Sequence, residues 1–185
     1  YKSLDGEGAI PVNIYFLPSK VWFDSTDFYD NAFYYRGQEN SGEMIVAVPK
    51  RNLNQICGAY LDVMAHEYGH AIIEHTSKFR DFYPQAAAMN EAFADIFGCC
   101  AEAIINKEDP DWVMGNDICI RNYKNLSDSK ESGKHITNYS EYNDSLDCHS
   151  ACTLISNIAY QSYNGLDTEE YTKDETKISD PQLMM

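Results

Sequence analysis

Short runs of β-branched and apolar residues mark the first 50 residues of the chain. Two of these runs, Ile10–Phe16 and Glu43–Val48, lie between turn-forming residues, which is typical of β-strands. The segment Asp24–Tyr35 is rich in Tyr, Phe and Asp. Its aromatic side chains could line a peptide groove, although packing in a core is the default interpretation. The N-terminal part is therefore predicted to be a small β-rich unit.

Beyond residue 55 the apolar positions follow a helical period. We predict helices over residues 56–77, 85–106 and 147–163. Gly69 lies inside the first helix, where glycine disfavours helix by roughly 1 kcal/mol relative to Ala. We interpret Gly69 as a point of close approach between two helices. The apolar residues of the second helix at helical spacing are Met89, Phe93, Ile96 and Phe97.

The segments outside these elements are polar. Residues 107–145 carry many Asn, Asp, Ser and Lys with little periodicity, which predicts a long surface loop region. A polar, acidic tail follows Asn164. We divide the chain into a β-rich lobe over 1–55, a helical lobe over 56–165 and a tail over 166–185.

Composition and charge exclude some classes of function. Hydrophobic residues make up 44% of the 185 residues, which is enough for a globular core. The net charge of −15 disfavours binding to nucleic acid or to anionic membrane surfaces. No apolar run reaches the length of a membrane span, and we find no signal peptide. The six cysteines are consistent with disulfides in an exported protein and equally with free thiols.

The run His66-Glu67-Tyr68-Gly69-His70 carries the strongest chemical signal. It has the form H-E-x-x-H within a predicted helix, where residues four apart share a face, so both imidazoles can reach one metal ion. This is the zinc-hydrolase arrangement, in which two His bind Zn²⁺ and the Glu is the general base. The alternative is a surface helix that carries two His and a Glu by chance.

The second helix supplies the remaining groups. Glu91 can be the third metal ligand, and Asp95, four residues later on the same face, can accept the ring N–H of a ligand His. Asn90 could play a similar supporting role. On its own this pair of carboxylates would be read as solvated, but after an H-E-x-x-H helix we favour ligation. The longer motif with a third His in the same run is excluded, because Ile73 and Thr76 stand at its Gly and His positions.

The two helix segments, Asp62–Ala71 and Asn90–Gly98, resemble the thermolysin-like neutral metallopeptidases. Weaker similarities flank them in the family's order, over roughly residues 28 to 160. They are the edge-strand segment Asn31–Tyr34, the loop Asp109–Trp112 with Gly115, and the pair Asp144 and His149. The resemblance implies an α+β fold, with a small β-rich N-terminal lobe, a helical C-terminal lobe and a zinc site in the cleft between them.

The resemblance also implies a role for each matching residue. One Zn²⁺ would be bound by His66, His70 and Glu91, with Glu67 as the base that deprotonates the attacking water. His149, held by Asp144, would stabilise the oxyanion. Asn31 and the backbone of Ala32 would bind the substrate main chain.

The chain departs from the family's pattern at several positions. The family's Tyr oxyanion donor would be Tyr83, although Phe82 falls nearer the expected distance from Asn90. Lys124 holds the place of a substrate-binding Arg, with Arg121 nearby as a substitute, and Lys lacks the bidentate fork of Arg. The candidate calcium ligands are the three acidic residues Asp62, Glu102 and Asp111. They match only part of the family's calcium cluster, so we expect at most one weak Ca²⁺, and solvated acids are about equally consistent.

The leading hypothesis is a zinc-dependent endopeptidase that acts on peptides or proteins. It would cleave on the amino side of apolar residues, with Val63 lining the pocket. The alternative is a catalytically lapsed or truncated zinc-binding domain that serves as a binding module. An accidental motif in a protein without zinc is a remote third option. The resemblance implies a secreted protein that is made as a precursor. The first residue is Tyr1 and not Met, so we expect the chain to begin inside a larger gene product. We expect a monomer.

Overall fold

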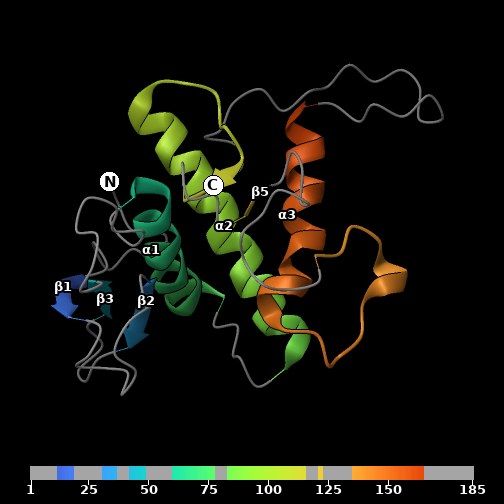
Figure 1. Ribbon diagram of the computed structural model, residues 1–185, viewed down its shortest axis with the longest axis horizontal. Coiled ribbons are helices and arrows are strands. Elements are labelled where there is room, and N and C mark those ends of the chain that lie inside the picture. Colours follow the sequence, from blue (N-terminus) through green and yellow to red (C-terminus); the bar gives the residue numbers. More distant parts are fainter. Residues whose placement is uncertain are drawn as a thin grey trace.

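The structure, a computed structural model, describes residues 12–18, 31–36, 42–48, 60–77, 83–115, 121–122 and 135–164. Within this part, three strands form one small sheet beside a set of three long helices (Figure 1). The strands are β1 (Val12–Pro18), β2 (Asn31–Arg36) and β3 (Gly42–Val48). The helices are α1 (Leu61–Thr76), α2 (Pro84–Asn106) and α3 (Cys148–Asn164).

The sheet has the strand order β1-β3-β2. Strand β3 pairs parallel with β1 and antiparallel with β2, so β2 is an edge strand of the described sheet. The hydroxyl of Tyr34 in β2 donates a hydrogen bond to Glu74 of α1 (3.0 Å), which ties the sheet to the first helix. Asn31–Tyr34 thus lies in the last strand of the described order, and its role as a substrate-binding edge stays a prediction. The rest of the predicted β-rich lobe lies outside the described residues.

Helix α2 lies between α1 and α3 (Figure 1). It begins at Pro84, whose fixed φ angle and missing N–H suit the first turn of a helix. It ends where Lys107 adopts a left-handed conformation (φ 60°) and the N–H of Glu108 bonds to the carbonyl of Ala103. The helix predicted over 85–106 is therefore confirmed to within one residue.

The expected close approach at Gly69 is also confirmed. A Cβ atom at this position would lie 3.1 Å from Cα of Ala94 in α2. Gly98 is tighter still, because a Cβ there would lie 2.6 Å from the carbonyl oxygen of Asp62. The two glycines let the backbones of α1 and α2 approach closely, and this approach sets the distance between the residues that the two helices contribute to the site.

Aromatic residues close the core on the side of α3. Trp112 is 1% exposed, and its ring packs against the rings of Tyr160 and Tyr163 at centroid distances of 5.9 and 5.7 Å. The hydroxyl of Tyr163 donates to Asp109 (2.7 Å), which anchors the loop after α2 to α3. Buried Met114 lies in the short strand β4 (Val113–Met114), which pairs with β5 (Arg121–Asn122).

The region predicted as a polar loop, residues 107–145, has little regular structure in its described part. It contains only β4, β5 and one turn of 3₁₀-helix, η6 (Tyr139–Glu141), among the described residues. None of the described helices combines the length and apolar character that a membrane span needs. The four described cysteines, Cys99, Cys100, Cys148 and Cys152, are free thiols. Cys57 and Cys119 lie outside the described residues.

Candidate metal centre

Two histidines of α1 face each other at the centre of the molecule. His66 is buried, His70 is half-buried, and their Nε2 atoms lie 3.0 Å apart. The other nitrogen of each ring is taken up by α2: Nδ1 of His66 lies 2.9 Å from Oδ1 of Asp95, and Nδ1 of His70 lies 2.9 Å from Oδ1 of Asn90. A carboxylate or amide oxygen can only accept a hydrogen bond, so these neighbours favour the neutral tautomer of each ring that carries its proton on Nδ1. Both Nε2 atoms then present lone pairs to the same point.

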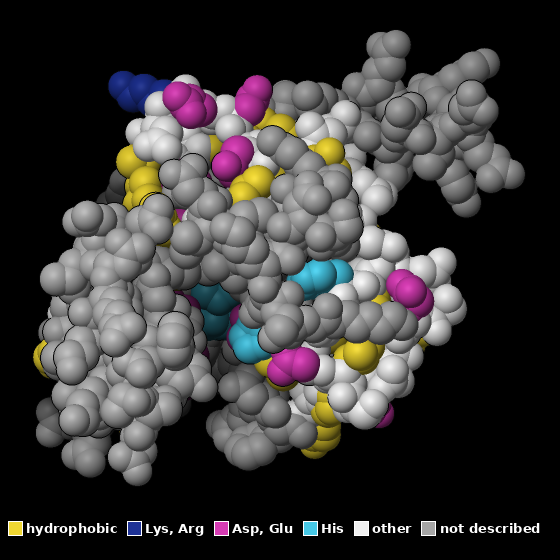
Figure 2. Space-filling model, viewed as in Figure 1, with side chains coloured by type: hydrophobic (Ala, Val, Ile, Leu, Met, Phe, Trp, Pro, Cys, Tyr) yellow, Lys and Arg dark blue, Asp and Glu magenta, His cyan; other side chains and the backbone are white. Residues whose placement is uncertain are grey.

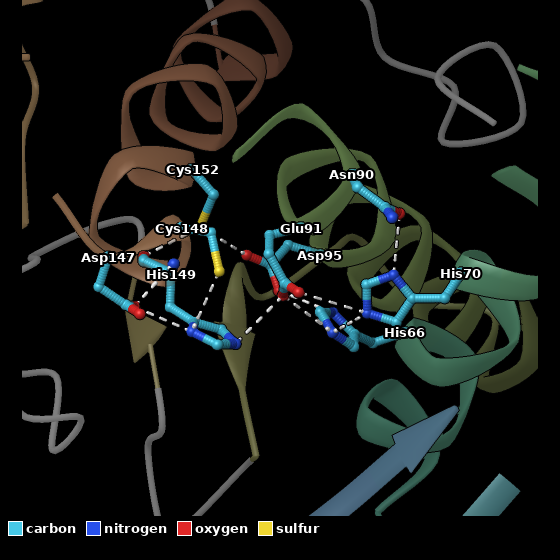
Figure 3. Close-up of polar contacts among 9 residues, drawn as sticks. All are labelled: His66, His70, Asn90, Glu91, Asp95, Asp147, Cys148, His149 and Cys152. Atoms are coloured by element: carbon cyan, nitrogen blue, oxygen red, sulfur yellow. Dashed lines mark hydrogen bonds and ion pairs between the residues drawn. The ribbon is translucent and has the colours of Figure 1, made fainter. Parts of the chain in front are cut away.

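The carboxylate of Glu91 completes this group from α2. Its Oε2 lies 3.5 Å from Nε2 of His66, and its Oε1 lies 3.7 Å from Nε2 of His70 (Figure 3). With both rings neutral, two carboxylate oxygens and two imidazole lone pairs converge, and none of these four atoms then brings a proton. Oε2 of Glu91 is buried and makes no hydrogen bond with the described residues.

This donor set fits a zinc ion. Two imidazoles and one carboxylate are the ligands of a known class of hydrolytic zinc site, which keeps a fourth position open for water or substrate. The three residues form one of two groups of potential ligands whose atoms all lie within 4.8 Å of one another in the described part of the chain. A cation at this point removes the repulsion among the lone pairs. Asp95 and Asn90 already hold the two rings in the tautomer that ligation requires.

The electrostatics of the group favour a positive charge. Burial disfavours the protonated ring of His66, but hydrogen bonding to Asp95 and Glu91 outweighs burial and raises the pKa of His66. Burial likewise disfavours the ionised form of Glu91, yet the bond to His66 and the neighbouring imidazoles lower its pKa. The carboxylates around the ring of His66 therefore favour a positive charge at this point.

Glu67 follows His66 in sequence and is 6% exposed. Its negative charge contributes to the raised pKa of His66, and Glu67 is not one of the three converging residues. Its role as a general base stays a prediction of the H-E-x-x-H pattern.

His149 joins the group from the first turn of α3. Its Nε2 lies 3.5 Å from Oε2 of Glu91, and its side chain is 43% exposed. Figure 2 shows histidine side chains gathered in a hollow in the middle of the molecule. Glu91 thus lies between the ring of His149 and the two rings of α1 (Figure 3).

The partner expected for His149 is wrong. Nδ1 of His149 lies 3.0 Å from Oδ1 of Asp147, whereas Oδ1 of Asp144 accepts hydrogen bonds from Gln85 (2.7 Å) and Tyr142 (3.0 Å). The physical reason is helix capping, because Oδ1 of Asp147 also accepts the backbone N–H of His149 (3.0 Å) just before α3 begins. An Asp at the start of a predicted helix is a capping signal, and Asp147 is the first residue of the helix predicted over 147–163, so this signal could have identified it from the sequence.

The remaining predicted substrate residues are not tested by the structure. Ala32 is 5% exposed and belongs to the core, while the side chain of Asn31 lies outside what is described. Tyr83 stands at the start of α2 with an exposed ring (69%). The side chain of Arg121 and the whole of Lys124 lie outside the described residues.

The calcium site stays a prediction, although the charge of Asp111 acts on Asp62. Among the described residues, neither group of ligand atoms within 4.8 Å of one another includes Asp62, Glu102 or Asp111. The carboxylate of Asp62 is fully buried and accepts the backbone N–H groups of Val63 (2.8 Å) and Gly115. Through the bond to Gly115, Asp62 holds the loop after α2 against α1.

The described part of the chain is mostly helical with one small sheet, and α1 and α2 bring two imidazoles and one carboxylate to a single point. The comparisons identify the family. A family model described as the α-helical domain of thermolysin metallopeptidases matches residues 81–180. The chain therefore belongs to the thermolysin metallopeptidase family.

Individual relatives agree with this assignment. The chain is 29% identical over 157 residues to bacillolysin of Bacillus cereus, covering 80% of this chain and 26% of the relative. It is 32% identical over 111 residues to protease PrtS of a Photorhabdus strain, covering 57% of this chain and 28% of the relative. The chain thus spans about a quarter of the length of these relatives.

A solved structure shows the same fold. The precursor of protealysin, a metalloproteinase from Serratia proteamaculans, superposes with a TM-score of 0.56 at 20% sequence identity. The match covers 88% of this chain and 51% of the Serratia chain.

Proposed function

We propose that this chain is a zinc-dependent endopeptidase that hydrolyses peptide bonds. The observation that carries the proposal is the convergence of Nε2 of His66, Nε2 of His70 and the carboxylate of Glu91, with the other nitrogen of each ring held by α2. A buried group of acceptors without a donor is costly unless a cation occupies it. The similarity of this chain to thermolysins and bacillolysins supports zinc as that cation.

Residues of the three helices have different roles in the proposed peptide hydrolysis. When bound, zinc supplies Lewis acidity, which polarises a peptide carbonyl and makes a water molecule easier to deprotonate. Glu67 accepts the proton of the attacking water and passes it to the leaving amine. Asp95 holds the ring of His66 through its Nδ1, and Asn90 does the same for His70.

His149 stabilises the negative charge that develops on the carbonyl oxygen. Its two ring nitrogens lie near two carboxylates, Asp147 at 3.0 Å and Glu91 at 3.5 Å. An imidazolium carries an N–H on both nitrogens, so it suits this pair of neighbours and retains a donor for an oxyanion at Nε2. Asp147, which also begins α3, is the residue that positions this ring.

The substrate side of the proposal rests on the edge of the sheet and on the family. Strand β2 comes last in the strand order of the described sheet, and an extended peptide can add to the edge of a sheet through main-chain hydrogen bonds. We place Asn31 and Ala32 there as main-chain contacts, with Tyr83, Lys124 and Arg121 as further substrate residues. By analogy with the family, we further propose that the enzyme cleaves on the amino side of apolar residues, with Val63 lining the pocket. We also propose that the protein is secreted.

The test compares two substitutions in α1 on a quenched fluorescent peptide with an apolar residue after the scissile bond. Glu67→Gln keeps the size of the side chain but removes the base, so we expect peptide cleavage to fall by at least about 10²-fold while zinc content stays the same. His75→Gln is the matched control, because His75 lies on the same helix and its Nδ1 bonds to the carbonyl of Ala71 (2.8 Å).

Three outcomes separate the hypotheses. Cleavage that is lost in Glu67→Gln, kept in His75→Gln and abolished by a chelator supports the endopeptidase. Zinc binding without cleavage of any peptide in a library supports the lapsed binding module. Cleavage that is unchanged by Glu67→Gln contradicts the role of Glu67.

A further inference from the structure

Cys148, the first residue of α3, introduces a thiol at the edge of the metal centre. Its sulfur lies 3.6 Å from Nδ1 of His149, and the residue is half-buried (Figure 3). Glu91, Cys148 and His149 are the second group of described residues whose potential ligand atoms all lie within 4.8 Å of one another. The group combines a sulfur, a ring nitrogen and a carboxylate oxygen, and it uses two residues outside the first set of ligands.

We propose that Glu91, Cys148 and His149 form a second site for a thiophilic divalent ion such as Zn²⁺, which shares the carboxylate of Glu91 with the first site. Thiolate, imidazole and carboxylate are all ligands of Zn²⁺, at about 2.0–2.3 Å. Such bonds need donor atoms roughly 3.3–3.8 Å apart. The sulfur lies 3.6 Å from Nδ1 of His149, and Oε2 of Glu91 lies 3.5 Å from Nε2 of the same ring. The three residues can each offer one ligand atom within 4.8 Å of the others, so binding one ion needs only a modest approach of these atoms.

The carboxylate of Glu91 is placed to bridge two ions. Its Oε1 faces His70, and its Oε2 lies 3.5 Å from Nε2 of both His66 and His149. Two-metal sites with ions about 3.5–4 Å apart commonly share such a group. The carboxylate of Asp147, 3.0 Å from the ring of His149, adds negative charge beside the second position.

Occupation of the second site requires the thiolate form of Cys148. The S–H bond breaks when the S–metal bond forms, and the proton passes to solvent, so no oxidant or reductant is needed. On the basis of the proposed function, this second ion would occupy Oε2 of Glu91 and the ring of His149. It would thereby withdraw the oxyanion donor and lower peptide cleavage when metal is in excess.

The test titrates the metal-free chain with Co²⁺ and follows two readouts. Thiolate–Co²⁺ charge-transfer absorption in the near ultraviolet reports the sulfur ligand, and mass spectrometry counts the ions bound per chain. We expect the wild-type chain to bind two ions and to develop the absorption. Cys148→Ser should bind one ion and show no absorption, with Cys148→Ala as a second variant and circular dichroism as the check on folding.

Two further variants locate the thiol and separate this site from the first. Cys152→Ser is the matched control, because Cys152 also belongs to α3 but lies outside the group of ligands, and its variant should keep the absorption. His70→Ala removes a ligand of the first site only, so it should bind one ion and keep the absorption. Absence of the absorption in the wild type, or its persistence in Cys148→Ser, would overturn the second site.

The same experiment distinguishes failure of the first site. If His70→Ala binds as many ions as the wild type and keeps the absorption, the second site stands and the proposed zinc site of α1 does not. With excess Zn²⁺ as inhibitor, the concentration for half-inhibition should rise at least about tenfold in Cys148→Ser. Losing even an outer partner of a ligand lowers metal affinity 10- to 100-fold.

Discussion

Replacing Gly98 by Ala tests whether the backbones of α1 and α2 are in close contact at this position. The added Cβ would lie 2.6 Å from the carbonyl oxygen of Asp62, 3.4 Å from its carbonyl carbon and 3.3 Å from Cε of Met114. Two of these three atoms belong to the backbone of α1, so no side-chain rotation relieves the overlap. The two helices have to separate by roughly 0.4 Å or more to restore even a 3.0 Å contact.

The expected change in the free energy of unfolding follows from two opposing effects. Replacing Gly by Ala inside a helix stabilises it by about 1 kcal/mol. Overpacking of a well-packed core costs 1–3 kcal/mol, and the upper end applies because the contact is with backbone, so the net destabilisation is about 2 kcal/mol. For a chain of 150–250 residues this lowers Tm by about 4–8 °C.

The assay is urea unfolding followed by circular dichroism, with all variants at the same free zinc concentration, because bound metal adds stability by mass action. Gly69→Ala is the matched control: the same substitution at the same helix interface, with the nearest atom at 3.1 Å instead of 2.6 Å. We expect Gly69→Ala to stay within about 1 kcal/mol of the wild type, because the gain in helix propensity offsets a smaller overlap. If Gly98→Ala proves as stable as Gly69→Ala, the close-contact argument is refuted.

Three further predictions follow from single contacts. Asp95→Asn weakens the hold on Nδ1 of His66 (2.9 Å) and should lower zinc affinity about 10- to 100-fold in chelator competition; unchanged affinity would contradict the role of Asp95. Burial raises the pKa of Cys100 to about 12 and raises that of Cys99 well above its usual value. Iodoacetamide at pH 8 should therefore label half-buried Cys148 long before Cys99 and Cys100, and peptide mass spectrometry measures the order of labelling. Equal labelling of all three thiols would count against this burial. Lys107 has a left-handed backbone conformation (φ 60°) at the end of α2, which glycine adopts without strain, so Lys107→Gly should stabilise the fold by about 1 kcal/mol. A fall in Tm would contradict this and show that the Lys side chain stabilises the fold.

The metal-binding face could be predicted from the sequence because it depends on local periodicity. His66 and His70 are four apart on one helix, and Glu91 and Asp95 are four apart on the next, so each pair shares a face whatever the tertiary structure. Apolar spacing predicted both helices, and the packing of the two faces against each other then left little freedom for the ligands. The close approach at Gly69 was predictable for the same reason, since glycine inside a helix is otherwise unfavourable.

The partner of His149 could not be predicted from family order, because it depends on where a helix begins. The pattern of the family pointed to Asp144, five residues before His149, but α3 begins at Cys148 and the capping carboxylate of Asp147 reaches the ring instead. The start of α3, which sequence order does not fix, thus decides that the carboxylate beside the imidazole is that of Asp147. The thiol of Cys148 was likewise visible in the sequence, but only the packing of α3 against α2 places it beside Glu91.

The pairing of the strands also needed the structure. The apolar runs near residues 12–18 and 42–48 read as strands, but nothing in them indicates that β1 pairs parallel with β3 while β2 pairs antiparallel on the other side. Strand direction is set by connections and by the covering helix, which local sequence does not encode.

The most direct test of the central claim is the zinc content of three purified chains, supplied with one equivalent of Zn²⁺ and measured by mass spectrometry after dialysis. The account predicts about one zinc per chain in the wild type and in His75→Gln, and a large loss of zinc in His70→Gln. A wild-type chain without zinc, or a His70→Gln variant that retains as much as His75→Gln, would contradict the metal centre on which the proposed function rests.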